Sequence, residues 1–100
     1  MIFLALASFP QKEIKEAAKA FLALKPLPAS IKRQGPYFKI VGESSIEIFT
    51  LYEFEPDFLD KAQKFLESRY LAFAEVAGFK VTIEPRLDMQ ETLLKLQIKP

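Results

Sequence analysis

Apolar and polar residues follow one another at two different spacings along this chain, and each change of spacing marks a new element. Residues 2–8 (IFLALAS) are largely apolar on both faces of an extended chain, which predicts a short buried strand. Over residues 10–24 apolar side chains recur every three or four positions between lysines and glutamates, which predicts an amphipathic helix. Residues 25–36 (KPLPASIKRQGP) contain several proline breaks, so we expect a rigid connector there.

The middle of the chain has the pattern of a hairpin. Residues 37–41 predict a strand, residues 42–45 (GESS) a turn, and residues 46–54 a longer strand enriched in β-branched and aromatic side chains. Two strands joined by so short a turn are expected to pair with each other.

A second helix is expected to open at Pro56 and Asp57, with an apolar stripe that continues as far as Val76. Gly78 stands where a left-handed C-cap would be needed. Residues 79–85 alternate between apolar and polar side chains, as a half-exposed edge strand does. Asp88 and Glu91 then have the spacing of a capping box and predict a short C-terminal helix.

The order β-α-β-β-α-β plus a short helix predicts an α+β protein of the ferredoxin-like class, in a single domain over residues 1–100. Its sheet would have four antiparallel strands with the helices on one face. In that arrangement the first and third strands are central, which agrees with their more apolar character.

The sheet face without helices needs a second cover, because neither face of the two central strands is polar throughout. Phe49 and Leu51 lie on one face of the third strand, between Glu47 and Glu53. Large exposed apolar patches usually mark interaction sites, so we expect a homodimer in which Phe49 and Leu51 form the seam.

Composition excludes several kinds of chemistry. The chain has no cysteine and no histidine, which removes disulfides, thiol nucleophiles, the usual general base and the commonest metal ligand. No spacing of aspartate and glutamate predicts a metal site. The formal net charge is only +1, and the third strand carries two acids and no base, so we expect no nucleic-acid partner.

Residues 2–7 lack the basic flank and the length of a signal peptide, and no run approaches the ~18 apolar residues of a membrane span. We therefore expect no membrane partner and a cytoplasmic location.

Three stretches carry a resemblance to a known family: residues 51–54 (LYEF), 69–73 (RYLAF) and 78–85 (GFKVTIEP). Together with the layout from residue 2 to about residue 85, they are similar to a small uncharacterised bacterial and archaeal group of the dimeric α+β barrel superfamily. The superfamily includes monooxygenases, isomerase-like enzymes and haem-degrading enzymes, so the resemblance implies a homodimer with a small-molecule pocket. The haem-degrading branch uses a histidine ligand that this chain does not have, and no cofactor is expected.

Candidate site residues follow from charge and position. Between Glu16 and Glu43 every charged residue is basic, and from Glu43 to Asp60 every one is acidic. Arg33 lies in the basic segment on the expected connector, and Tyr37 follows at the start of the next expected strand; a small-molecule or anionic ligand could bind there. Solvated surface charge, or charge that sets the register of a dimer, would explain the same pattern.

Tyr70 is a further candidate for ligand binding, although a core tyrosine with a satisfied hydroxyl explains its position as well. For catalysis the candidates are Glu53 and Tyr52, because a carboxylate beside a tyrosine can serve as a general acid or base. Cross-strand ion pairs are the alternative explanation of Glu53.

The leading hypothesis is thus a small-molecule-binding homodimer. The alternatives are a cofactor-independent monooxygenase or isomerase-like enzyme that uses Glu53, a tyrosine and Arg33, and a regulatory or interaction module with a dry, filled interface.

Overall fold

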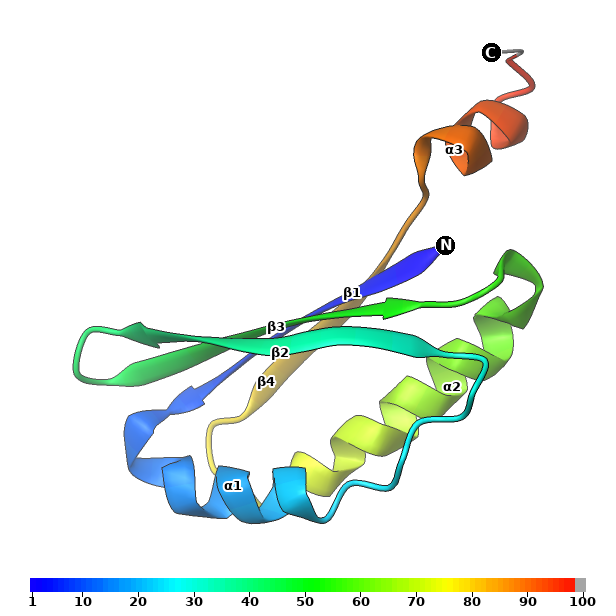
Figure 1. Cartoon of the computed structure of the whole chain (residues 1–100). Helices are drawn as coiled ribbons and strands as arrows, with labels where there is room; N and C mark the ends of the chain where they lie inside the picture. The colour runs from blue at the N-terminus through cyan, green and yellow to red at the C-terminus, as the bar shows by residue number, and fades with distance from the viewer. Residues whose placement is uncertain (99–100) are drawn as a thin grey trace.

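The computed structural model describes residues 1–98 and is an α+β arrangement of four strands and three helices (Figure 1). In chain order the elements are β1 (Ile2–Pro10), α1 (Ile14–Leu22), β2 (Lys32–Val41), β3 (Ser45–Glu53), α2 (Leu59–Tyr70), β4 (Lys80–Arg86) and α3 (Met89–Lys95). Short 3₁₀ turns at Gln11–Glu13, Pro56–Phe58 and Leu71–Phe73 adjoin α1 and α2.

The four strands form one antiparallel sheet in the order β2-β3-β1-β4. The first and third strands are central and the second and fourth lie at the edges, as predicted. Leu6 of β1 is opposite Phe49 of β3 and Thr82 of β4, which fixes the register of the three strands. This α+β arrangement is compatible with a ferredoxin-like fold.

Helices α1 and α2 pack against one face of the sheet (Figure 1). Phe3 and Phe9 of β1 are 1 % exposed beneath them, and burying each such side chain stabilises the fold by about 1.5–3 kcal/mol. Ala17 of α1 and Ala62 of α2 are fully buried, and their small side chains let the helices approach the sheet closely.

The strand β2 begins earlier than predicted, which corrects the expected connector over residues 25–36. Gly35 and Pro36 predict a break, but in the structure they form an irregularity inside the edge strand, where the register shifts between Gln34 and Tyr37. Bulges of this kind accommodate glycine and proline in edge strands because one residue drops out of the ladder. Arg33 therefore lies in a strand and not on a loop.

The first two predicted helices are shorter than expected. Pro10 belongs to β1, and α1 begins only at Ile14, after a 3₁₀ turn. The helix α2 ends at Tyr70 and continues only as a 3₁₀ turn. Gly78 has the left-handed φ of +77° that was expected, but it lies in the link before β4 and does not cap α2.

The short helix α3 projects away from the sheet (Figure 1). Its predicted capping box is confirmed. The Asp88 side chain accepts a hydrogen bond from the backbone N–H of Glu91, and the Glu91 side chain accepts one from the backbone N–H of Asp88. The amino group of Met1 lies 2.9 Å from Glu91 Oε1 and holds the base of this helix. The projection contributes to a radius of gyration of 15.4 Å, against about 13 Å for a compact chain of this length.

Within residues 1–98, no helix is both long and apolar enough to cross a lipid bilayer.

Candidate functional sites on the two sides of the sheet

The face of the sheet opposite the helices is made of alternate residues from each strand. On β3 these are Glu47, Phe49, Leu51 and Glu53, which are exposed or half-buried, whereas the residues between them are buried under the helices. The structure thus places Phe49 and Leu51 on the open face, together with the two glutamates.

Apolar side chains lie side by side in the middle of this face. Phe49 is opposite Leu6 of β1 and Tyr37 of β2, and Leu51 is opposite Leu4. Exposed fractions are 60 % for Tyr37, 42 % for Leu6 and 38 % for Phe49. We call these five residues, Leu4, Leu6, Tyr37, Phe49 and Leu51, the open-face patch.

Two rows of residues cross the sheet on either side of the open-face patch, and in each row three of the four side chains are charged. The hairpin-end row, next to the β2–β3 turn, consists of Lys39, Glu47, Ser8 and Lys80. The N-terminal row, at the other end of the strands, consists of Lys32, Glu53, Ile2 and Arg86. Each row has a glutamate on the central strand β3 and cations on both edge strands.

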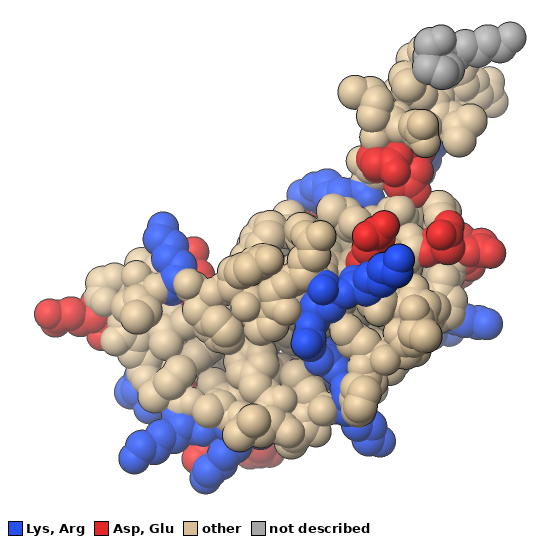
Figure 2. Space-filling model, in the orientation of Figure 1, with Lys and Arg blue, Asp and Glu red and all other residues tan. Residues whose placement is uncertain are grey.

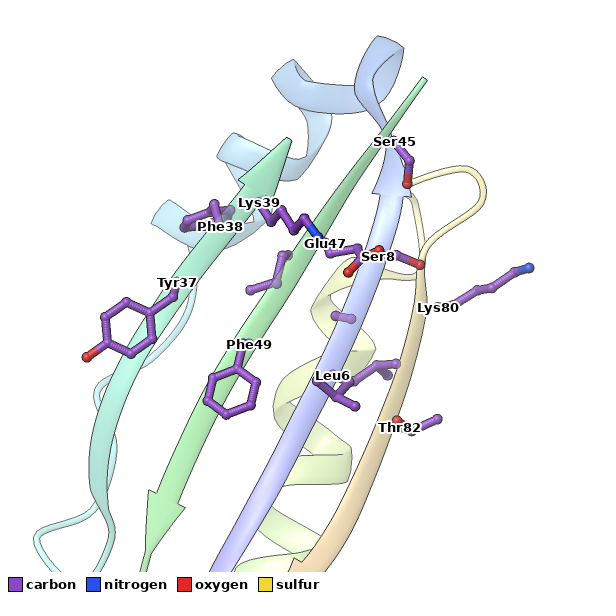
Figure 3. A pocket seen from close by; sticks show the side chains of 13 residues that line it. Leu6, Ser8, Tyr37, Phe38, Lys39, Ser45, Glu47, Phe49, Lys80 and Thr82 are labelled. Atoms are coloured by element: carbon purple, nitrogen blue, oxygen red, sulfur yellow. The ribbon is translucent and has the colours of Figure 1, made fainter. Parts of the chain in front are cut away.

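A shallow cavity of about 540 Å³ lies between the open-face patch and the hairpin-end row. Figure 3 shows Tyr37, Phe49 and Leu6 along its apolar side and Lys39 extending toward Glu47 on its charged side. A volume of several hundred Å³ is within the usual range for small-molecule sites.

On the helix-covered side, two tyrosines meet between the sheet and α2. Tyr52 of β3 is 3 % exposed, and its hydroxyl lies 2.8 Å from the hydroxyl of Tyr70 of α2. Burial, together with the neighbouring Tyr52, raises the pKa of Tyr70 far above its usual value, so this phenol keeps its proton. Thr50, a residue 2 % exposed on the same face of β3, borders the same small space.

A groove opens to solvent beside this tyrosine pair, between the segment after α1, the strand β2 and the helix α2. We call it the arginine groove. Its cationic lining residues are Lys25, Arg33 and Arg69, its apolar lining includes Phe21, Leu24 and Leu27, and its volume is about 600 Å³. The narrow inner end is bordered by Thr50, Tyr52 and Tyr70.

The charges of the molecule are segregated at a larger scale as well. Figure 2 shows basic side chains over α1, and acidic side chains gathered where the chain passes from β3 to α2 and where α3 begins. The acidic side chains between β3 and α2 belong to the acidic segment of the sequence, whereas Asp88 and Glu91 at α3 lie outside it.

The structure brings some of the sequence-predicted site residues together and separates others. Arg33 and Tyr70 border the arginine groove, whereas Tyr37 lies on the open face. Tyr52 and Glu53 are neighbours in sequence but lie on opposite faces of β3, with Tyr52 buried and Glu53 exposed. The two catalytic candidates therefore do not share a site.

Sequence reasoning missed Arg69, Lys25 and Thr50. Thr50 had a visible signal, because it is a polar residue at an inward position between Ile48 and Tyr52. For Arg69 and Lys25 the sequence has no comparable signal, because their proximity depends on how α2 packs beside the connector after α1.

Within residues 1–98, no three side chains of the Asp, Glu, His or Cys type are grouped as a metal site would require.

No protein-family model and no curated protein sequence matches the chain. A similar fold occurs in the crystal structure of a tripeptidase from Staphylococcus aureus, with a TM-score of 0.50 and 14 % sequence identity. The match covers 98 % of this chain and 35 % of the tripeptidase, so the chain spans about a third of that protein. At this identity the likeness concerns the fold alone.

Proposed function

We propose that this protein is a small-molecule-binding protein of the dimeric α+β barrel type, with a ferredoxin-like fold and a homodimer interface on its open sheet face. The observation that carries the proposal is the open-face patch, an apolar surface on a sheet whose helices cover only the other side. Surfaces of this kind usually mark interaction sites.

A second copy of the chain is the occupant that the charges favour. A two-fold axis along β1 would place β3 of one copy over β4 of the other, with the residue rows kept in register. Glu47 would then lie opposite Lys80 of the partner subunit, and Glu53 opposite Arg86 of the partner subunit. Leu4 and Leu6 would pack against their own equivalents at the centre of the interface.

The cavity beside the patch would become the ligand site of this dimer. It extends across all four strands, from residues 37–39 of β2 to residues 80–82 of β4, so the partner's sheet would cover the part over β1, β3 and β4. A covering sheet would shield the apolar side of the cavity from water and leave its β2 side open as an entrance. The mixed lining of aromatic rings and Lys39, Glu47 and Thr82 favours a small ligand with both apolar and polar groups.

Native mass spectrometry of the purified 100-residue chain tests the proposal, because it reports the subunit number and any retained molecule together. A dimer that carries extra mass in excess of buffer ions supports both parts. A dimer whose mass is that of two chains alone supports the interface but contradicts a tightly retained ligand. That result would favour an interaction module with a filled interface. A monomer at micromolar concentration would overturn the proposal.

A further inference from the structure

The helix-covered side of the molecule offers a second site, which is independent of the proposed dimer. We propose that the arginine groove binds a small organic carboxylate, with its carboxylate between Arg33 and Arg69 and its apolar part against Phe21 and Leu24. Within residues 1–98 the groove has two arginines without acidic partners, an anchored Arg69, a tyrosine pair at its inner end and apolar walls.

The two arginines come from different elements and border the same cavity. Arg33 belongs to β2 and Arg69 to α2, and the lining of the groove includes no aspartate or glutamate. The ion pairs found within residues 1–98 join Met1 to Glu91, Lys19 to Glu16 and Arg86 to Glu84, so neither groove arginine has a carboxylate partner in this part of the chain. Two guanidinium groups without counter-charges favour an anionic ligand, which arginine binds through paired N–H donors.

Arg69 is held in place before any ligand arrives. Its Nη1 donates a hydrogen bond of 2.6 Å to the backbone carbonyl oxygen of Lys25. A guanidinium has five N–H donors, so this contact leaves others free to bind a ligand. Because the side chain is already fixed, less conformational entropy is lost when an anion binds to it.

The inner end of the groove supplies a neutral donor. In the pair formed by Tyr52 and Tyr70 one hydroxyl donates to the other, and the acceptor keeps its own proton for a further partner. Thr50, Tyr52 and Tyr70 border the narrow space that Arg33 and Arg69 also line, so the hydroxyl pair adjoins the two arginines. A tyrosine phenol keeps its proton at neutral pH even at its ordinary pKa, and burial raises the pKa of Tyr70 further.

The remaining walls favour an organic anion over a bare inorganic one. Phe21, Leu24 and Leu27 line the groove together with Pro26 and Pro36. A volume of about 600 Å³ is far larger than a phosphate needs and is suited to a ligand with an apolar body. The expected ligand class is therefore a monocarboxylate with an aromatic or branched apolar group.

The test is an NMR titration of the ¹⁵N-labelled 100-residue chain with 3-phenylpropionate as the probe. We expect saturable shifts at the backbone amides of Arg33, Arg69 and Tyr70, because these residues border the site. The uncharged 3-phenylpropanamide should bind at least tenfold more weakly, since it cannot pair with the two arginines. Inorganic phosphate should also bind more weakly, since it cannot use the apolar walls.

Three variants locate the site. Arg33→Gln should weaken 3-phenylpropionate binding by about tenfold, and Tyr70→Phe by a smaller factor. Lys61→Gln removes one positive charge from the exposed surface of α2 and serves as the matched control, with unchanged affinity expected. Arg69→Lys keeps the charge but loses the planar fork, and should weaken binding less than Arg33→Gln does.

The proposal is overturned if 3-phenylpropionate gives no saturable shifts, if the amide binds as tightly as the carboxylate, or if Lys61→Gln weakens binding as much as Arg33→Gln. Binding of phosphate as tight as that of the probe would also overturn it, because the site would then recognise charge alone. These outcomes do not depend on the oligomeric state, so the dimer can fail while this site stands.

Discussion

The hydroxyl oxygens of Tyr52 and Tyr70 lie 2.8 Å apart, one on a central strand and the other on the last turn of α2. Tyr70 also packs its ring against Phe73 and Phe79, with ring centroids 5.9 and 6.5 Å away. The pair thus joins the sheet, the helix and the segment that leads into β4 through one hydrogen bond and one aromatic cluster.

Removing one hydroxyl of this pair should destabilise the protein by a measurable amount. Tyr70→Phe keeps the ring packing but leaves the buried Tyr52 hydroxyl without its partner, so we expect the free energy of unfolding to fall by about 1–3 kcal/mol. Urea denaturation followed by circular dichroism measures the change. Tyr37→Phe removes an exposed hydroxyl and should change stability by less than about 0.5 kcal/mol. Equal losses in the two variants would contradict the role of the pair.

The same tyrosine should make stability depend on pH in the alkaline range. Burial beside Tyr52 raises the pKa of Tyr70 in the folded chain, whereas an unfolded tyrosine titrates near pH ~10. The folded state therefore holds a proton that the unfolded state releases. Its contribution is fully present below about pH 10 and is lost as the pH rises toward the folded pKa.

Urea midpoints measured at about pH 8 and about pH 11 test this dependence. The unmodified protein should lose more stability between the two than Tyr70→Phe does, because the variant lacks the titrating group. Lysine titration affects both proteins alike and cancels in the comparison. An identical loss in the two proteins would show that Tyr70 does not contribute.

Charged substitutions in the open-face patch should separate the proposed dimer into monomers. Phe49→Glu would place an unpaired charge in an apolar interface, and Leu51→Glu would place a second acid in the row of Glu84, which the axis along β1 brings over β3. Both changes are strongly unfavourable. Sedimentation velocity should show monomers, while the far-ultraviolet circular dichroism stays unchanged. Leu22→Glu, at a residue of α1 that is 88 % exposed, is the matched control and should stay dimeric. Dimers that survive both patch substitutions would show that this face is not the interface.

The orientation of the dimer can be tested with a charge reversal. If β3 lies over β4 of the partner subunit, Lys80→Glu places like charges together at Glu47 and should raise the dimer dissociation constant by about tenfold. The double variant Glu47→Lys with Lys80→Glu restores opposite charges and should recover most of the affinity. A double variant that dimerises no better than Lys80→Glu alone would contradict the axis along β1.

Much of the fold was predictable because its signals are local. The alternation over residues 79–85 and the capping box of Asp88 and Glu91 depend only on near neighbours, and both correspond to observed elements. The first half of β2 was not predictable in this way. Gly35 and Pro36 have the same local preferences in a connector and in a bulge, and only pairing with β3 decides between them.

The candidate sites were less predictable than the fold. The sequence indicates Arg33 and Tyr70 as two separate candidates for ligand binding. They border a common groove only because α2 packs beside β2. Arg69 follows no motif, and its position is set by a hydrogen bond to Lys25, far away in the sequence. Contacts of this kind arise from tertiary packing, which a single sequence does not encode in any local pattern.

The bulge in β2 should require glycine at position 35. Gly35 has a φ of +96°, and a Cβ there would lie 2.9 Å from the carbonyl oxygen of Phe49. Gly35→Ala should therefore destabilise the chain by about 1–3 kcal/mol, through backbone strain and through displacement of the β2–β3 pairing. Gly42 in the hairpin turn is the control, because its φ is also positive, at +59°, but nothing lies within 4 Å of a Cβ there. Gly42→Ala should cost about 1 kcal/mol from strain alone. Thermal or urea unfolding of both variants measures the difference, and a smaller loss for Gly35→Ala than for Gly42→Ala would show that β2 does not approach Phe49 as closely as the structure has it.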